Sequence, residues 1–249
     1  MAAPDRVTWL GHSTVAVELD GVRLLTDPVL SRRVVHLQRL VEPPRELPAA
    51  EAVLVSHAHY DHLDLRTLRR LRTTPQVVVP RGLGSMLRLR GFKHVVEVVA
   101  GDEVQVGAVT VRATPAYHSG WRPGAARGTA AVGYAVVGSA RVFFAGDTGL
   151  FPELESLVPE LDVALLPVGG WGPKLPDDHL DPERAARALA LLRPRLAVPI
   201  HWGTYRRVGM RDDEPRRAAE EFRRAAAEHA PGVHVAILEP GESLDVTTP

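Results

Sequence analysis

The sequence predicts one mixed α and β domain with at least two β-sheets, and three observations support this fold class. Short runs rich in β-branched residues recur along the chain, separated by turns of Gly, Pro and Asp. Helical periodicity occurs only in a few segments between these runs. No linker-like stretch, low-complexity tract or internal repeat divides the 249 residues. We therefore expect a single α+β domain that spans residues 1–249.

The predicted strands begin with a hairpin. Thr14–Leu19 alternates apolar positions, and Asp20-Gly21 predicts a tight turn into Val22–Thr26. Ala52–Ser56 and Gln76–Pro80 are compact apolar runs typical of buried strands. The remaining predicted strands share the β-branched composition: Val95–Val99, Glu103–Val106, Val109–Ala113, Ala131–Val137, Arg141–Ala145, Asp162–Val168, Leu196–Ile200 and His234–Leu238.

Three segments have the periodicity or the end signals of helices. Asp64–Leu71 places a Leu at every third position, with Arg on the other faces. Asp181–Leu192 begins with Asp at the N-cap and Pro at the first helical position. Arg216–His229 is rich in Ala, Arg and Glu and ends before Pro231-Gly232. The N-terminal half is therefore mostly hairpins, and the C-terminal half alternates strand and helix.

Composition limits the classes of function. Hydrophobic residues make up 45% and charged residues 24%, the ordinary balance of a soluble globular protein. The 30 Lys and Arg balance the 30 Asp and Glu, so no net positive field attracts nucleic acid, and we expect no nucleic-acid partner. No leader pattern and no run of about 20 apolar residues is present, so we expect a cytoplasmic protein without a transmembrane segment.

The segment Ser56–His62 carries four side chains of the metal-ligand type in six residues: His57, His59, Asp61 and His62. In an extended stretch, residues two apart point the same way, so His57 and His59 can hold one cation from one side. Asp61 and His62 follow where the chain turns and can address a second cation. Imidazole with carboxylate suits Zn, Fe or Mn rather than Ca or Mg. A solvated polar turn is the alternative, and the density of ligand-type residues disfavours it.

The pattern His-x-His-x-Asp-His resembles the metallo-β-lactamase superfamily. This superfamily also uses a later His, an Asp in a Gly-Asp-Thr-like turn and a final His, each after a strand. The chain has these residues in that order: His118 after Ala116-Tyr117, Asp147 in Gly146–Gly149 and His201 before Trp202-Gly203. The resemblance implies a four-layer αββα sandwich with the metal site at one edge of the two sheets.

The resemblance also implies how the ligands divide between two divalent metal ions, with zinc expected first and manganese or iron as alternatives. His57, His59 and His118 would hold the first ion, and Asp61, His62 and His201 the second. Asp147 would bridge both ions. Two metals that share a hydroxide lower its pKa and polarise the oxygen of the substrate. Asp61, beside that hydroxide, would act in catalysis by orienting it or accepting its proton.

The branch of the superfamily can be narrowed from local differences. Many true β-lactamases have Cys in place of the bridging Asp, whereas this chain has Asp147 and no Cys, so we do not expect a β-lactamase. The diiron flavoprotein branch typically has a carboxylate where this chain has His59. Four short segments look like the N-acyl-phosphatidylethanolamine phospholipase D group, which is related to ascorbate-6-phosphate lactonase: Trp9–Thr14, Leu25–Pro28, His57–Asp64 and His201–Thr204.

The expected function is therefore a dinuclear-metal hydrolase that acts on a phosphodiester or a phosphorylated small molecule. A lactonase or another carboxylic ester hydrolase with the same metal core is the alternative, because the same hydroxide attacks a carbonyl. A metal-binding module without catalysis is the third reading. The expected partner is a small-molecule or lipid-like ester. Val29–Val41 mixes apolar and Arg residues, which suits a lid or a peripheral membrane contact.

Four further residues are candidates for roles beside the ligands. His179 lies two residues before the N-cap Asp181, where free N–H groups favour an anion, and we expect it to contact the substrate or to protonate the leaving group. A hydrogen-bonded loop histidine is the alternative. Trp171 could line the substrate cleft or simply pack. His12 and Asp27 are expected to support the ligands from outside rather than to bind metal.

Overall fold

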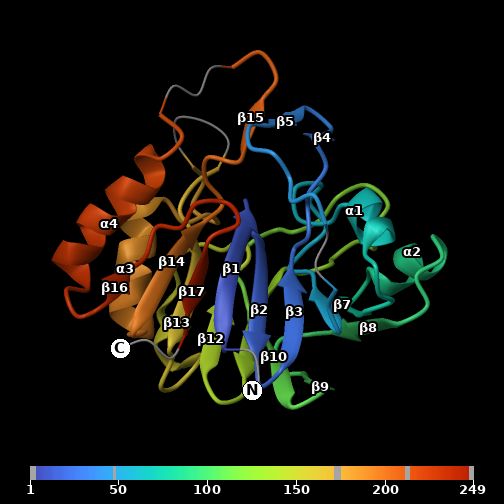
Figure 1. The fold of residues 1–249 in the computed structure, drawn as a ribbon, viewed down its shortest axis with the longest axis horizontal. Helices are drawn as coiled ribbons and strands as arrows, with labels where there is room; N and C mark the ends of the chain where they lie inside the picture. The colour runs from blue at the N-terminus through green and yellow to red at the C-terminus, as the bar shows by residue number, and fades with distance from the viewer. Residues whose placement is uncertain (1–3, 47–48, 171–174, 211–213, 247–249) are drawn as a thin grey trace.

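The structure is a computed structural model, and it describes residues 4–46, 49–170, 175–210 and 214–246. Two seven-stranded sheets face each other, and helices cover their outer faces (Figure 1). A three-stranded sheet lies beyond one end of the sandwich. No helix in the described residues has the length and apolar character that crossing a bilayer requires.

The first sheet joins an antiparallel half to a parallel half. Its order is β17 (Ser243–Asp245), β1 (Arg6–Gly11), β2 (Thr14–Leu19), β3 (Val22–Thr26), β6 (Ala52–Leu54), β7 (Gln76–Pro80) and β8 (Val95–Val98). The strands from β17 to β3 pair antiparallel, and those from β3 to β8 pair parallel.

The second sheet has the same mixed character. Its order is β16 (His234–Val235), β14 (Leu196–Ile200), β13 (Val163–Pro167), β12 (Arg141–Phe144), β11 (Val132–Val137), β10 (Val109–Pro115) and β9 (Glu103–Val106). Here β9 to β12 pair antiparallel, while β12, β13, β14 and β16 pair parallel.

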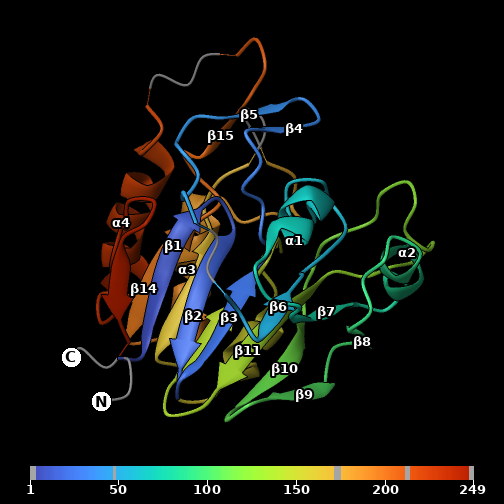
Figure 2. The ribbon, with the colours of Figure 1, turned by 45° about the vertical axis from the view of Figure 1, so that its right-hand side comes forward.

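Strand periodicity separates the layers of the sandwich. Ala52 and Leu54 of β6 belong to the core that also contains strands of the second sheet, whereas the intervening Val53 packs in a separate cluster with Leu68 and Leu87. Those two leucines come from α1 (Leu65–Arg70) and α2 (Gly84–Arg88). The opposite outer layer consists of α3 (Pro182–Leu192) and α4 (Arg217–His229) (Figure 2). This arrangement confirms the expected four-layer αββα sandwich.

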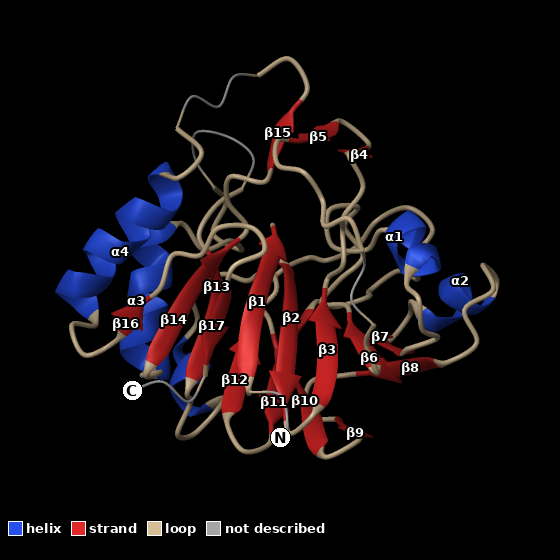
Figure 3. Ribbon diagram, viewed as in Figure 1, coloured by secondary structure: helices blue, strands red, loops and turns tan. Residues whose placement is uncertain are grey.

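The segment Val29–Val41 forms most of the third sheet. Its strands are β4 (Arg33–Val34) and β5 (Leu37–Arg39), and β15 (Tyr205–Arg207) completes the order β15-β5-β4. A small core of Val29, Val34, Leu37 and Tyr205 holds it together. This sheet lies at the top of Figure 3, beyond the ends of the sandwich strands. Its role as a lid or a membrane contact stays a prediction.

The described elements differ from the predicted ones mainly at their ends. The three predicted helices form, with Asp64 and Asp181 as N-caps that accept backbone N–H bonds. The strand predicted at His234–Leu238 ends at Val235, and that predicted at Ala52–Ser56 ends at Leu54. Sequence reasoning missed the six-residue strand β1 and the shorter elements β4, β5, β15, β17, α2 and the 3₁₀ turn Pro152–Ser156.

The loops that carry the predicted ligands lie at one end of the sandwich, which we call a pole. The start of β1 and the end of β17 lie at the opposite pole. β1 runs from Arg6 to Gly11, and His12 follows it at the pole of the candidate site. Arg6 pairs with Asp245, so β1 starts and β17 ends at the far pole (Figure 1).

Candidate metal centre

The predicted ligands come from four loops, each of which follows a strand. His57, His59, Asp61 and His62 follow β6; His118 follows β10; Asp147 follows β12; and His201 follows β14. The loop after β6 turns tightly because the N–H groups of His62 and Leu63 both donate to the carbonyl of His59. The structure brings the loops of both sheets together at one pole of the sandwich.

His57, His59 and His118 form the first ligand group. His59 Nδ1 lies 3.0 Å from His57 Nε2 and 3.2 Å from His118 Nε2. Burial is the largest effect on these rings: it lowers the pKa of His57 well below its usual value and that of His59 to about 4, and it also lowers the pKa of His118. Three neutral imidazoles therefore turn their nitrogens toward one point, as ligands of one cation do.

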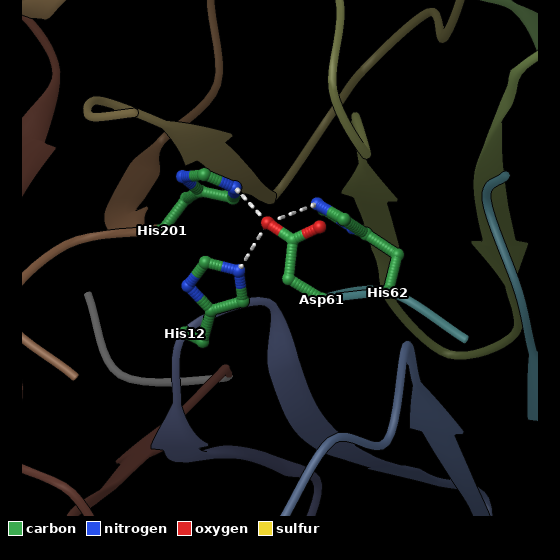
Figure 4. Close-up of side chains that lie close together, drawn as sticks. All are labelled: His12, Asp61, His62 and His201. Carbon is green, nitrogen blue, oxygen red and sulfur yellow. Dashed lines mark hydrogen bonds and ion pairs between the residues drawn. The ribbon is translucent and has the colours of Figure 1, made fainter. Parts of the chain in front are cut away.

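Asp61, His62 and His201 form the second ligand group (Figure 4). Asp61 Oδ2 lies 3.7 Å from His201 Nε2 and 3.9 Å from His62 Nε2. Burial raises the pKa of Asp61, but His62, His12 and His201 outweigh it and hold this pKa well below its usual value. The carboxylate is therefore charged at neutral pH and faces two imidazole nitrogens.

Asp147 faces the second ligand group with both of its carboxylate oxygens. Its Oδ2 is 3.3 Å from His62 Nε2, and its Oδ1 is 3.5 Å from His201 Nε2. Burial raises the pKa of Asp147, but His201 and His62, and also His57 of the first ligand group, lower it well below its usual value. The carboxylate is therefore charged at neutral pH.

The unsatisfied atoms of the centre test whether these residues fit a metal. His62 Nε2 and Asp147 Oδ1 are buried, and neither has an aligned hydrogen bond within the described part of the chain. Leaving buried polar atoms without partners costs free energy. A divalent cation would satisfy both atoms, and a donor set of imidazole and carboxylate suits Zn, Mn or Fe. The residues present therefore fit the metals that the sequence implies.

Asp27 and Ser56 support both ligand groups from behind. Asp27 Oδ2 accepts hydrogen bonds from His62 Nδ1 at 2.6 Å and from Ser56 Oγ at 2.5 Å, and Oδ1 accepts the Ser56 N–H at 2.7 Å. Ser56 Oγ lies 2.9 Å from His57 Nδ1. A carboxylate behind an imidazole fixes its tautomer and leaves Nε2 for a metal. That Asp27 acts outside the ligand set stays a prediction, since its carboxylate also lies within 4.8 Å of nitrogens of His57 and His62.

His179 lies beside the first ligand group, and a residue that sequence reasoning missed holds it there. Asp178 Oδ1 lies 2.9 Å from His179 Nδ1, and its Oδ2 lies 3.1 Å from His118 Nδ1. His179 Nε2 faces Asp147 Oδ2 at 3.7 Å. The only signal for Asp178 in the sequence was its place next to His179, in the approach to a helix.

His12 lies closer to the second ligand group than sequence reasoning placed it. Its Nε2 is 3.3 Å from Asp61 Oδ2, and one of its ring nitrogens lies within 4.8 Å of potential ligand atoms of Asp61, His62 and His201. Burial, with the neighbouring His201, lowers the pKa of His12 to about 3, so this ring is neutral.

Three exposed aromatic side chains are close in the sequence to residues of the first ligand group. Tyr60 and Tyr117 directly precede or follow its ligands in the sequence, and Trp121 lies three residues after His118. Their exposed fractions are 47%, 61% and 43%, which is high for side chains of this size. The buried Arg122 lies over the Tyr60 ring at 4.4 Å and donates to the carbonyl of Leu63. Trp171, predicted to line the cleft, lies outside the described residues.

Comparison with known proteins gives the same picture. Residues 22–202 match the family described as the beta-lactamase superfamily domain. A metal-dependent hydrolase of Methanopyrus kandleri is 35% identical over 96% of this chain and 99% of its own length. The N-acyl-phosphatidylethanolamine-hydrolyzing phospholipase D 1 of Caenorhabditis elegans is 35% identical over 80% of this chain, which matches 64% of that protein.

A solved structure supports the fold. A metallo hydrolase from the archaeon Ignicoccus hospitalis superimposes with a TM-score of 0.73 at 28% identity, over 97% of this chain and 98% of the other. The family match covers most of the chain and includes all the ligand positions from His57 to His201. The chain therefore belongs to the beta-lactamase superfamily and is a metal-dependent hydrolase of this fold.

Proposed function

We propose that the protein is a dinuclear-metal hydrolase that cleaves a phosphodiester or another phosphorylated small molecule. The observation that carries this proposal is the position of Asp147, whose carboxylate faces His62 and His201 of the second ligand group and also His179, which Asp178 joins to His118 of the first. A carboxylate that lies near two groups of histidines is suited to bridge two cations.

The ligands divide between the two ions as the superfamily resemblance implies. His57, His59 and His118 would hold the first ion, and Asp61, His62 and His201 the second. Zinc is the expected metal, with manganese or iron as alternatives. When bound, such a pair supplies an acidified water and a Lewis acid for the oxygen of the substrate. Asp61 Oδ2 is charged and lies in the middle of the second group, so it can orient this water or accept its proton.

His179 is the proposed acid that protonates the leaving oxygen and contacts the substrate. Asp178 accepts the Nδ1–H of His179, which turns Nε2 toward Asp147 and the interior of the site. A proton on Nε2 therefore points to the place where an oxygen leaves.

Two features support a lipid-like ester as the substrate. The relative from Caenorhabditis elegans is named for hydrolysis of N-acyl-phosphatidylethanolamine. The third sheet presents exposed apolar side chains, Val35 and Val208, beside the Arg residues of β4 and β15, and such a surface suits a peripheral membrane contact. A contact of Trp171 with the substrate is also part of this proposal.

The test combines metal analysis with a panel of substrates. We expect two metal ions per chain and hydrolysis of bis-p-nitrophenyl phosphate that a chelator abolishes. His179→Ala should keep both metals and lose turnover about 10²–10⁴-fold, whereas His94→Ala, at an exposed histidine, serves as the matched control. Cleavage of lactones but not phosphodiesters would replace the proposal with the carboxylic ester alternative. Two bound metals without any hydrolysis would indicate a binding module.

A further inference from the structure

The backbone of His12 ties the two sheets together at the candidate metal centre. His12 lies in the turn between β1 and β2 with a φ of 56°, and His201 after β14 has a φ of 64°. The His201 N–H donates to the carbonyl of His12 at 2.9 Å. Left-handed conformations of non-glycine residues cost free energy and persist where the surroundings impose them.

Two further hydrogen bonds fix the same turn. The His12 N–H donates to Thr204 Oγ1 at 2.6 Å, and the indole N–H of Trp9 donates to the His12 carbonyl at 2.8 Å. The Trp9 ring itself stacks on Trp202 with 4.7 Å between the ring centroids. The backbone of His12 is therefore held from β1 and from the loop that carries His201, which determines where its side chain points.

The side chain of His12 points at Asp61. The ring is 2% exposed, and its centroid lies 4.0 Å from that of the His201 ring and 5.4 Å from that of the Tyr205 ring, to which it is nearly perpendicular. Nε2 lies 3.3 Å from Asp61 Oδ2. A carboxylate only accepts hydrogen bonds, so the proton of this contact is on Nε2 of His12.

We propose that His12 positions Asp61 for the second metal ion, an inference that rests on the proposed dinuclear centre. Asp61 comes from the turn after β6, and its Oδ2 lies nearer to His12 Nε2, at 3.3 Å, than to His201 Nε2 or His62 Nε2. The hydrogen bond from His12 keeps Oδ2 on the side where His62 Nε2 and His201 Nε2 converge (Figure 4). His12 thus acts through Asp61 and is a positioning residue, not a ligand.

Two substitutions separate hydrogen bonding from packing. His12→Phe keeps a ring between His201 and Tyr205 but removes the donor, whereas His12→Gln keeps an N–H donor near the place of Nε2 but removes the ring. His94→Gln makes the same change at an exposed histidine and is the matched control. The measurement is the affinity for each of two zinc ions, from titration of the metal-free protein against a zinc-buffering chelator, with metal per chain counted after equilibrium dialysis.

The proposal predicts opposite results for the two variants. His12→Phe should weaken the second zinc ion about 10–100-fold and leave the first unchanged, since loss of a ligand's hydrogen-bond partner has effects of this size. His12→Gln should bind the second ion nearly as the wild type does. In an Asp61→Ala background, adding His12→Phe should cause no further loss, because His12 acts through Asp61.

Each other result overturns the inference. A normal second site in His12→Phe with a weakened one in His12→Gln would mean that the ring only packs. Loss in both variants, with a further loss on the Asp61→Ala background, would make His12 a ligand. If every His12 variant binds two zinc ions as the wild type does, the positioning role of His12 is refuted and the dinuclear centre is not. If the wild type itself binds fewer than two zinc ions, the dinuclear centre is refuted as well.

Discussion

The strongest test of the support behind the ligands is Asp27→Asn. Asp27 is completely buried and accepts three hydrogen bonds, two of them on Oδ2 from Ser56 Oγ and His62 Nδ1. The substitution keeps the size of the side chain but places an amide N–H₂ or a neutral oxygen where Oδ2 was. If the oxygen keeps the Ser56 N–H, the amide nitrogen faces Nδ1 of His62, and two donors then meet.

The size of the effect follows from this one contact. His62 can leave its Nδ1–H unpaired, or it can move the proton to Nε2, the atom that faces Asp147 and the second ligand group. Losing a hydrogen bond to a charged group costs about 1.5–3 kcal/mol. Because about 1.4 kcal/mol corresponds to a factor of ten, the second metal should bind about 10–150-fold more weakly. The free energy of unfolding of the metal-free protein should fall by a similar amount.

The assay measures zinc affinity by chelator competition and stability by guanidinium denaturation, for Asp27→Asn and for Asp20→Asn as a control at an exposed aspartate. Nitrogen-15 NMR of the histidine rings reports which nitrogen of His62 carries the proton. A variant that keeps two zinc ions with wild-type affinity and His62 in its original tautomer would refute the reasoning.

Three further predictions concern packing and pH. Gly120→Ala places a Cβ 2.6 Å from the Cβ of His57, so we expect a loss of about 1–3 kcal/mol in unfolding free energy and weaker binding of the first metal. The control Gly232→Ala places a Cβ with nothing within 4 Å, and its unfolding free energy should stay within about 0.5 kcal/mol of the wild type. The pKa of His59 is about 4 in the folded protein and about 6.5 in the unfolded chain, so between these pH values only the unfolded chain binds a proton at His59. As the pH falls from 6.5 to 4, the unfolding free energy of the metal-free wild type should therefore decrease more steeply than that of His59→Gln. Equal slopes of unfolding free energy against pH would contradict this. Phe222→Ala removes a fully buried ring of α4 and should cost about 3–5 kcal/mol in denaturation, with a cost below about 1 kcal/mol as the contradicting outcome.

The fold was predictable wherever long apolar patterns carried a clear period. The helices at α3 and α4 agree with their predicted ranges within one residue because capping and composition mark their ends. Most of the missed elements are short, although β1 has six residues, as many as the predicted strand β2. The helix α2 has five residues, starts at Gly84 and has no side-chain cap, and β4 has two residues. Their formation depends on packing against the sheet and on tertiary pairing, which a local pattern does not contain.

The site was predictable as a set of ligands but not as a network. The spacing from His57 to His62, together with the family resemblance that singles out His118, Asp147 and His201, was sufficient to name residues that the structure brings together at one pole. The partners behind them come from distant parts of the chain: His12 meets Asp61 across 49 positions and Thr204 across 192. Nothing in the sequence near His12 or Asp178 reveals which side chain each one meets.

The arrangement of β1 and β17 has a consequence for handling the protein. The start of β1 and the end of β17 pair at the pole opposite the ligand loops. A linker attached at the start of β1 or at the end of β17 is therefore on the side of the protein opposite the ligand loops. If the protein is attached to a bead or a reporter at the start of β1 or the end of β17, its ligand loops face the solvent. Large substrates can then still reach these loops.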